Sequence, residues 1–365
     1  MGFKDVLERI ELMTKGNAKE ILDRILNSDD VYAAVKDLNK EISVDLYDLV
    51  IDEQEKAILS GDVELATGLN FLQEIIYQEG LGFASSHGLR FDHFQRIVIG
   101  LAGGLGAQMG QYALGRRLAL KNKAHLEFDT SYFPDHKQRT FRLNRLNTNC
   151  NIFEKNSQQN NTPFKVLQTN QDLFGSPAIT TKDNLYLYEC WTSHKYFQDI
   201  RPILTFELTP KDPVSKESQK LLDEIENCNS IGVHIRRGDY VSDPTVTVFH
   251  GFCTNDYFNA ATEITNTRIK TPCYYVFSDD IEWAKNNFIP SFPTQYINGT
   301  GADQDIEDML MMSKCKHNII SNSSFSWWGA WLNNNPQKII VAPKQWFKSE
   351  EINFSNICPP EWIKI

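Results

Sequence analysis

The feature that most constrains this chain is the regular alternation of short apolar stretches with helical patterns from Glu217 onward. Stretches of strand length recur at 231–235, 274–277, 295–297, 318–320 and 338–341. Strands that alternate with helices specify a parallel, doubly wound sheet. The sequence therefore predicts an α/β lobe in this half of the chain.

The first of these strands ends in a cluster of charge. The segment SIGVHIRRGDY, residues 230–240, begins as a buried strand and ends in two arginines, a glycine and an aspartate. Ligands of open α/β sheets bind at the carboxyl ends of strands. Arg236 and Arg237 can form bidentate hydrogen bonds with phosphate oxygens, and Asp239 can hold one of them in place. The alternative is a solvated basic pair beside a packed His234.

A second βαβ unit precedes this lobe. Residues 96–99 and 125–129 have the pattern of strands, 108–121 has that of a helix, and LAGGLG joins the first strand to the helix. Glycines at such a turn let backbone N–H groups approach an anion at the helix N-terminus. Gly104 and Gly106 are therefore candidate binding residues.

The same turn raises the alternative of a nicotinamide-dependent oxidoreductase. Glu127 or Asp129 would then bind the ribose, as an acidic residue does in dinucleotide-binding folds. The spacing argues against this function because Met109 occupies the position of the third glycine.

Two βα units joined by a crossing predict a two-lobed enzyme with a cleft between the lobes. We expect an N-terminal lobe at 89–205 and a C-terminal lobe at 206–365. Residues 1–88 are rich in helix formers at helical spacing. They predict a helical extension that serves interaction or homo-oligomerisation.

Composition limits the function classes. The formal net charge of −10 argues against a general nucleic-acid binder. The sequence has no apolar run long enough to span a bilayer and no signal segment, so we expect a cytoplasmic protein, with peripheral attachment to the inner face of the membrane as an option. Its seven cysteines lack a CxxC pair, which fits reduced thiols and offers no zinc site.

Further loops of the C-terminal lobe carry polar groups to the same sheet edge. FSDD at 277–280 supplies carboxylates, and Ser321 to Ser324 precede the helical segment FSWWGAWL with hydroxyl and N–H donors. A serine cluster there is also an ordinary N-cap. Asp303 and Asp305 match a short D-x-D string, but helix-start carboxylates explain it as well, and we expect no metal site. Together these loops predict a pocket for a nucleoside diphosphate.

Four segments, in order, resemble the bacterial α1,2-fucosyltransferases of glycosyltransferase family 11: LAGGLGAQMGQYALGRRLA, VHIRRGDY, YVFSDDIEWA and DMLMMSKCKHNIISNSSFSWWGAWLN. The likeness spans about residues 95–347 and leaves the first ninety outside. It implies a GT-B-like fold with two Rossmann-type lobes, an acceptor-side N-terminal lobe, and a C-terminal lobe that binds GDP-β-L-fucose. It also implies a galactose-terminated acceptor, inversion at the fucose carbon, and no metal or other cofactor.

The resemblance also implies roles for individual residues. Arg236 would hold the β-phosphate and the leaving oxygen, Arg237 would assist it, and Asp279 would support it. His234 would brace the nucleotide or its loop, and Asp308 would accept the guanine N–H groups. Two hydroxyls, those of Ser323 and Ser324, would bind the diphosphate.

Two positions depart from the family pattern, whose glycine loop reads GGLGNQMFQYA. Ala107 replaces the asparagine and Gly110 the phenylalanine. We expect Gln108 to take over the hydrogen bond of the missing amide.

The function predicted from the sequence is transfer of L-fucose from GDP-fucose to the 2-hydroxyl of a terminal galactose. The general base is either Asp239 or no dedicated residue at all, since no other carboxylate or histidine stands out for that role. The alternatives are a nucleotide-sugar or glycan binding module that has lost catalysis, and the oxidoreductase described above.

Overall fold

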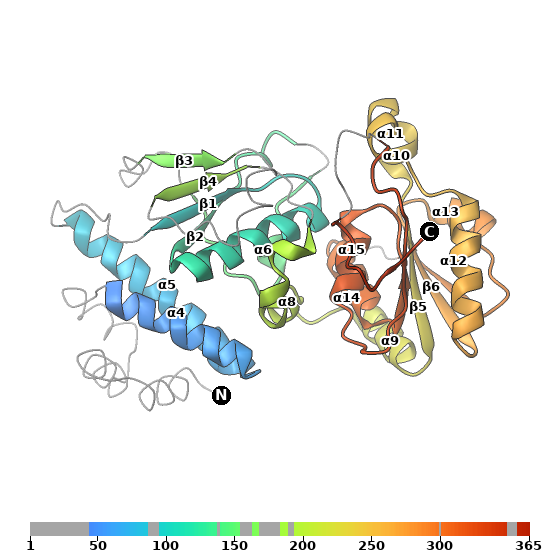
Figure 1. The fold of residues 1–365 in the computed structure, drawn as a ribbon, viewed down its shortest axis with the longest axis horizontal. Coiled ribbons are helices and arrows are strands. Elements are labelled where there is room, and N and C mark those ends of the chain that lie inside the picture. The colour runs from blue at the N-terminus through green and yellow to red at the C-terminus, as the bar shows by residue number, and fades with distance from the viewer. Residues whose placement is uncertain are drawn as a thin grey trace.

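The computed structural model describes residues 44–86, 95–136, 139–153, 163–167, 183–188, 193–298, 301–348 and 356–365. Within these residues the chain forms two parallel sheets, each in its own lobe, with helices packed against them (Figure 1). This confirms the predicted α/β class with two parallel-sheet lobes, the GT-B-like arrangement.

The N-terminal lobe is built on a four-stranded sheet with the order β2-β1-β4-β3. Its strands are β1 (Arg96–Gly100), β2 (His125–Asp129), β3 (Phe164–Leu167) and β4 (Asn184–Leu187). Every pairing is parallel, with Ile97 opposite Leu126 on one side and Leu185 on the other. Helix α6 (Leu105–Asn122) follows β1 through the glycine turn, which confirms the predicted β-turn-α-β unit.

The C-terminal lobe is built on a six-stranded sheet with the order β10-β9-β8-β5-β6-β7. Its strands are β5 (Asn229–Ile235), β6 (Pro272–Ser278), β7 (Thr294–Ile297), β8 (His317–Ile319), β9 (Ile340–Ala342) and β10 (Ile363–Lys364). All are paired in parallel, and β5 lies between β6 and β8. The strand that carries Arg236 and Arg237 at its end is therefore central, with all but its first residue buried.

The helices of this half follow the predicted βα order. They are α9 (Lys216–Glu226), α10 (Gly238–Ser242), α11 (Pro244–His250), α12 (Asn255–Arg268), α13 (Ile281–Asn287), α14 (Gln304–Lys314) and α15 (Ser324–Trp331). Between the lobes the chain passes through short 3₁₀ turns and α8 (Arg201–Glu207). The boundary placed before residue 206 falls inside α8, so a boundary after this helix keeps it whole.

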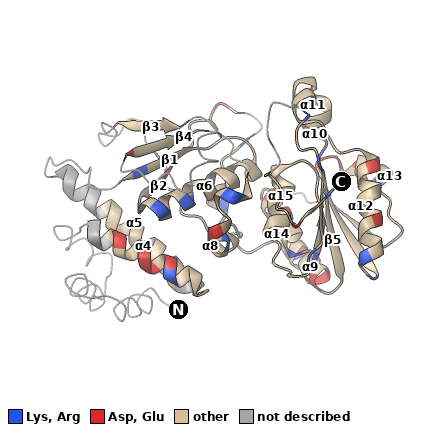
Figure 2. Ribbon diagram, viewed as in Figure 1, with Lys and Arg blue, Asp and Glu red and all other residues tan. Residues whose placement is uncertain are grey.

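The described part of the extension is a helical hairpin, α4 (Val44–Leu59) and α5 (Val63–Ser86), with its turn at residues 60–62. Residues 1–43 lie outside the described residues. Tyr77 of α5 stacks on His125 of β2 with ring centroids 3.3 Å apart. Acidic positions lie along helix α4 (Figure 2), and one of them, Asp52, pairs with Lys123 beyond α6 at 2.8 Å. The hairpin thus packs on its own N-terminal lobe, and oligomerisation through it stays a prediction.

The two lobes meet at the starts of α6 and α15 (Figure 1). A Cβ atom on Gly106 would lie 2.4 Å from the backbone nitrogen of Phe325 and 2.5 Å from the carbonyl carbon of Ser324. One hydrophobic core runs across this contact and includes Met109 of α6 and Trp328 of α15. The absence of a side chain at position 106 therefore sets how closely the lobes approach.

We expect Gly106→Ala to lower the free energy of unfolding by about 1–3 kcal/mol, because the new methyl group clashes with backbone atoms, which cannot rotate away as a flexible side chain can. Thermal unfolding monitored by circular dichroism measures the change. Gly104→Ala is the matched control, since its Cβ would have only the end of the Arg139 side chain within 4 Å. Equal melting temperatures for the two variants would contradict the proposed role of Gly106.

Candidate functional site

A cavity of about 770 Å³ lies between the lobes, a size suited to a nucleotide-sized ligand. The N-terminal lobe contributes the glycine turn and residues 139–142 to its wall. The C-terminal lobe contributes residues that follow β5, β6 and β8, together with part of α14. The predicted convergence of loops at the carboxyl edge of the second sheet is thus present in the structure.

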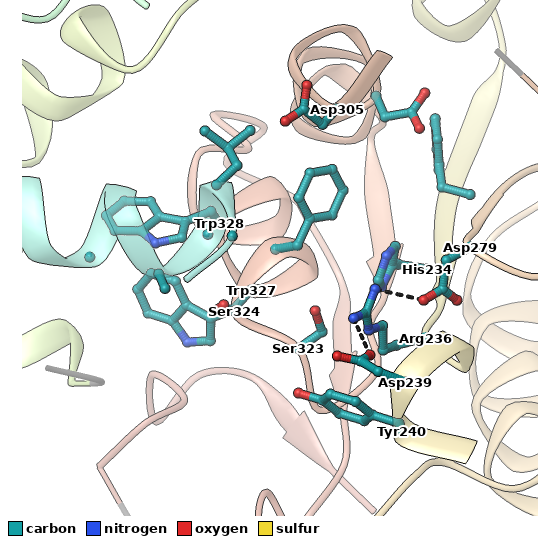
Figure 3. Close-up of a pocket in the computed structure, with 18 of the residues that line it drawn as sticks. His234, Arg236, Asp239, Tyr240, Asp279, Asp305, Ser323, Ser324, Trp327 and Trp328 are labelled. Carbon is teal, nitrogen blue, oxygen red and sulfur yellow. Dashed lines mark hydrogen bonds and ion pairs between the residues drawn. The ribbon is translucent and has the colours of Figure 1, made fainter. Parts of the chain in front are cut away.

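Arg236 is the central cation of this cavity. Its guanidinium lies between two carboxylates, with Nη1 at 2.6 Å from Asp279 Oδ2 and Nη2 donating to Asp239 Oδ1 (Figure 3). Its Cζ lies 5.2 Å from the ring centroid of Tyr240. The guanidinium is therefore held in place within the cavity before any ligand binds.

Gly238 makes this arrangement possible. Asp279 Oδ1 accepts the backbone N–H of Arg237 at 2.8 Å, and a Cβ on Gly238 would lie 2.5 Å from Asp279 Oδ2. The glycine thus lets one carboxylate bind both the backbone of the loop and the guanidinium of Arg236.

Arg237 does not line the cavity. Its guanidinium lies 3.9 Å from the centroid of the Trp283 ring, and its Nε lies 3.3 Å from Asp280 Oδ2. The two adjacent arginines therefore have different surroundings, and only Arg236 is placed to touch a ligand.

His234 is buried near the base of the cavity, where its Nδ1 lies 3.0 Å from Ser321 Oγ. Burial, and then the nearby charge of Arg236, lower the pKa of His234 to about 3. The imidazole is consequently neutral at physiological pH. It connects β5 to the serine loop that precedes α15.

Ser323 and Ser324 lie at the N-terminus of α15, and both line the cavity. Ser323 is the N-cap residue, yet its side chain makes no capping hydrogen bond. Its hydroxyl group faces the same space as Arg236 (Figure 3). Hydroxyl groups and backbone N–H groups at a helix N-terminus suit an anionic ligand.

Asp308 lines the cavity from α14, where its Oδ1 accepts a hydrogen bond from Gln304 Nε2. Burial raises the pKa of Asp308 to about 7. Among the described residues this buried carboxyl group has one side-chain donor, so it suits a ligand that supplies further N–H donors.

The glycine turn contributes Gly104 and Gly106 to the wall, but Gln108 does not line the cavity. Its buried amide donates to the carbonyls of Gly103 and Thr140 at 3.0 and 2.9 Å, and it accepts from the Arg142 N–H at 2.9 Å. Gln108 thus fastens the 139–142 segment to the turn, so the expectation that it faces a ligand does not hold in this structure.

The carboxylates of the D-x-D string bind arginines of the other lobe. Arg142 pairs with Asp303 and Asp305 at 2.9 and 2.5 Å, and Arg145 pairs with Asp303 at 2.5 Å. These contacts cross between the lobes at the edge of the cavity. They give the string a structural role.

The two carboxylates that could have bound the ribose of a nicotinamide cofactor already bind other side chains of the protein. Glu127 forms a buried ion pair with Arg96 at 2.6 Å, and Asp129 accepts from the hydroxyl of Tyr186 at 2.7 Å. The geometry thus does not favour the oxidoreductase alternative.

Among the wall residues that the sequence reasoning missed are an arginine and a histidine. Arg139 enters from the N-terminal lobe, and His250 ends α11 with its ring stacked on Tyr240 at 4.7 Å. Burial lowers the pKa of His250, and its Nδ1 has no hydrogen-bond partner among the described residues. No motif marks either residue, because their position depends on how the lobes and α11 pack.

Comparison with known proteins identifies the family. The profile described as Glycosyl transferase family 11 matches residues 92–365. The chain belongs to glycosyltransferase family 11. The match confirms the family predicted from the four sequence segments, and it begins after the helical hairpin.

Among relatives of this family 11 glycosyltransferase is the alpha-1,2-colitosyltransferase of Escherichia coli, 34% identical over 289 residues, 74% of this chain and 98% of that protein. The O-antigen biosynthesis glycosyltransferase WbnK of Escherichia coli is 32% identical over 73% of this chain and 99% of its own length. Galactoside alpha-(1,2)-fucosyltransferase 2 of Rattus norvegicus is 29% identical over 40% of this chain and 42% of its own.

Among solved structures, the NodZ alpha-1,6-fucosyltransferase co-crystallized with GDP aligns with 64% of this chain and 91% of its own, at 12% identity and a TM-score of 0.41. The family 11 glycosyltransferase has no described helix that meets the length and apolarity needed to cross a membrane.

The raised pKa of Asp308 predicts how the stability of the ligand-free protein depends on pH. In an unfolded chain an aspartate titrates near 3.9, so between about pH 4 and pH 7 unfolding releases a proton and stability falls as pH rises. We expect Asp308→Asn to melt at a higher temperature than the natural chain at pH 8, with little difference at pH 4. Asp305→Asn is the control, since it removes a carboxylate paired with Arg142 and gains nothing at pH 8. A melting temperature of Asp308→Asn that does not rise at pH 8 would refute the assignment.

Proposed function

We propose that this family 11 glycosyltransferase transfers L-fucose from GDP-β-L-fucose to the 2-hydroxyl of a terminal galactose, with inversion at the fucose carbon. The observation that carries the proposal is the placement of Arg236 between Asp279 and Asp239 in the interlobe cavity. A guanidinium fixed in this way stabilises negative charge that develops on a leaving diphosphate.

The donor is arranged around the groups described above. The β-phosphate binds Arg236 and the hydroxyls of Ser323 and Ser324, and the guanine N–H groups donate to Asp308. Asp279 positions Arg236 through their ion pair, and the neutral imidazole of His234 contacts Ser321 in the serine loop. The backbone N–H of Arg237 donates to Asp279 and so stabilises the loop that follows β5. Since arginines supply the positive charge, the reaction needs no metal ion.

In the transfer, the bond between the fucose anomeric carbon and the β-phosphate oxygen breaks, and its electron pair stays on GDP. The acceptor oxygen forms the new bond from the opposite face and loses its proton. We assign the proton to Asp239, because this carboxylate binds Arg236 and also contacts Arg139 of the N-terminal lobe, where the acceptor binds. Asp279, by contrast, also accepts the backbone N–H of Arg237.

Colitose is a second candidate for the transferred sugar, because the Escherichia coli alpha-1,2-colitosyltransferase is 34% identical to this chain over 98% of that relative's length. Colitose is fucose without its 3-hydroxyl group. Purified protein incubated with GDP-fucose or GDP-colitose and a panel of galactose-terminated oligosaccharides, read by mass spectrometry, identifies the donor and the acceptor. Binding of GDP-fucose without GDP release for any acceptor would instead support the binding module.

We expect Arg236→Ala to leave a folded protein whose turnover falls about a hundredfold or more, because the charge on the departing diphosphate then lacks its fixed cation. Arg237→Ala is the matched control, since that guanidinium lies on Trp283 outside the cavity; its turnover is expected to fall less than about tenfold. The rate of GDP release measures both variants. Near-normal turnover in Arg236→Ala would exclude the assigned role.

A further inference from the structure

A further guanidinium enters the cavity from the opposite lobe. Arg139 lines the cavity beside the glycine turn, and its Nη1 lies 3.4 Å from where a Cβ on Gly104 would be. Its Nη2 donates to Asp239 Oδ2 at 3.2 Å, and 34% of its side chain remains exposed. This is the one hydrogen bond of its guanidinium among the described residues.

Asp239 is thus shared by two arginines from two lobes. Oδ1 accepts from Arg236 of the C-terminal lobe, and Oδ2 accepts from Arg139 of the N-terminal lobe. A phosphate group presents its oxygens with similar spacing and carries more charge than a carboxylate. It can therefore take the place of Asp239 between the two guanidinium groups.

The other cavity-lining arginine of this segment is differently engaged. Arg142 donates to Asp303, to Asp305 and to the carbonyl of Ala302, so its guanidinium is already occupied by protein acceptors. An arginine has five N–H donors, and most of those on Arg139 have no acceptor within the part of the chain that the structure describes. Of the two, Arg139 is the cation left for a ligand.

We propose that Arg139 binds the β-phosphate of the nucleoside diphosphate from the N-terminal lobe and, with Arg236, takes the charge that appears when the glycosidic bond breaks. The inference rests on the proposed function. When the phosphate occupies both guanidinium groups, Asp239 loses both of its partners. It then accepts the proton of the acceptor hydroxyl, so donor binding itself prepares the base.

The test is calorimetric titration of the full chain with GDP and with GMP, which lacks the β-phosphate. Arg139→Gln is expected to weaken GDP binding about tenfold or more and GMP binding less than about twofold. Arg117→Gln is the matched control, because Arg117 is an arginine of the same lobe that pairs with Asp199 outside the cavity. GDP affinity in this control is expected to equal that of the natural chain.

The same titration in an Asp239→Asn background separates direct binding from an effect through Asp239. The tenfold loss caused by Arg139→Gln is expected to persist there, and its disappearance would overturn the inference. If the natural protein and the Arg139→Gln variant bind GDP with equal affinity, the inference about Arg139 is overturned, while the proposed function stands. Natural protein that binds no GDP overturns both.

A crystal structure of the natural chain with GDP decides the matter even if Arg139→Gln does not fold. We expect an Nη atom of Arg139 within about 3.2 Å of a β-phosphate oxygen. Arg139 still bound to Asp239 and remote from the phosphate would refute the proposal.

Discussion

The close backbone contact between α6 and α15 is the constraint on which the rest of the structure depends. At Gly106 the first turn of α6, in the N-terminal lobe, meets the first turn of α15, in the C-terminal lobe, with no room for a methyl group. The shared core behind this contact, with Phe197 stacked on Trp328 at 5.3 Å, keeps the two sheets at a set separation. The cavity is the space left beside that contact, so residues of both lobes reach one ligand.

Paired charges line that space. Arg236 is balanced by Asp279 and Asp239, Asp239 also binds Arg139, and Arg142 binds Asp305. Such pairing lowers the cost of holding several guanidinium groups in a half-buried site. It also means that a ligand must compete with carboxylates for these groups. A diphosphate meets this requirement because it brings more negative charge and more acceptor oxygens than a carboxylate.

The sequence predicted the sheet edge well, because the relevant residues follow parallel strands directly. Arg236 comes one residue after β5 and Asp279 one residue after β6, and adjacent parallel strands bring such positions together. The local pattern alone did not separate Arg236 from Arg237, to which only the family resemblance assigned different roles, because their different surroundings depend on the contacts of Gly238 and Trp283. It also placed Gln108 toward the ligand, whereas the amide satisfies backbone groups of a loop more than thirty residues away.

Arg139 shows where prediction from local pattern ends. It lies 100 positions before Asp239, has no periodic or motif context, and reaches the cavity only because the lobes close against each other at α6 and α15. A residue of this kind acts only when both lobes are assembled, whereas Arg236 is held by its own lobe. Under the proposed function the diphosphate binds cationic groups of both lobes, so its tight binding would require the contact between α6 and α15 that brings Arg139 and Arg236 to one cavity.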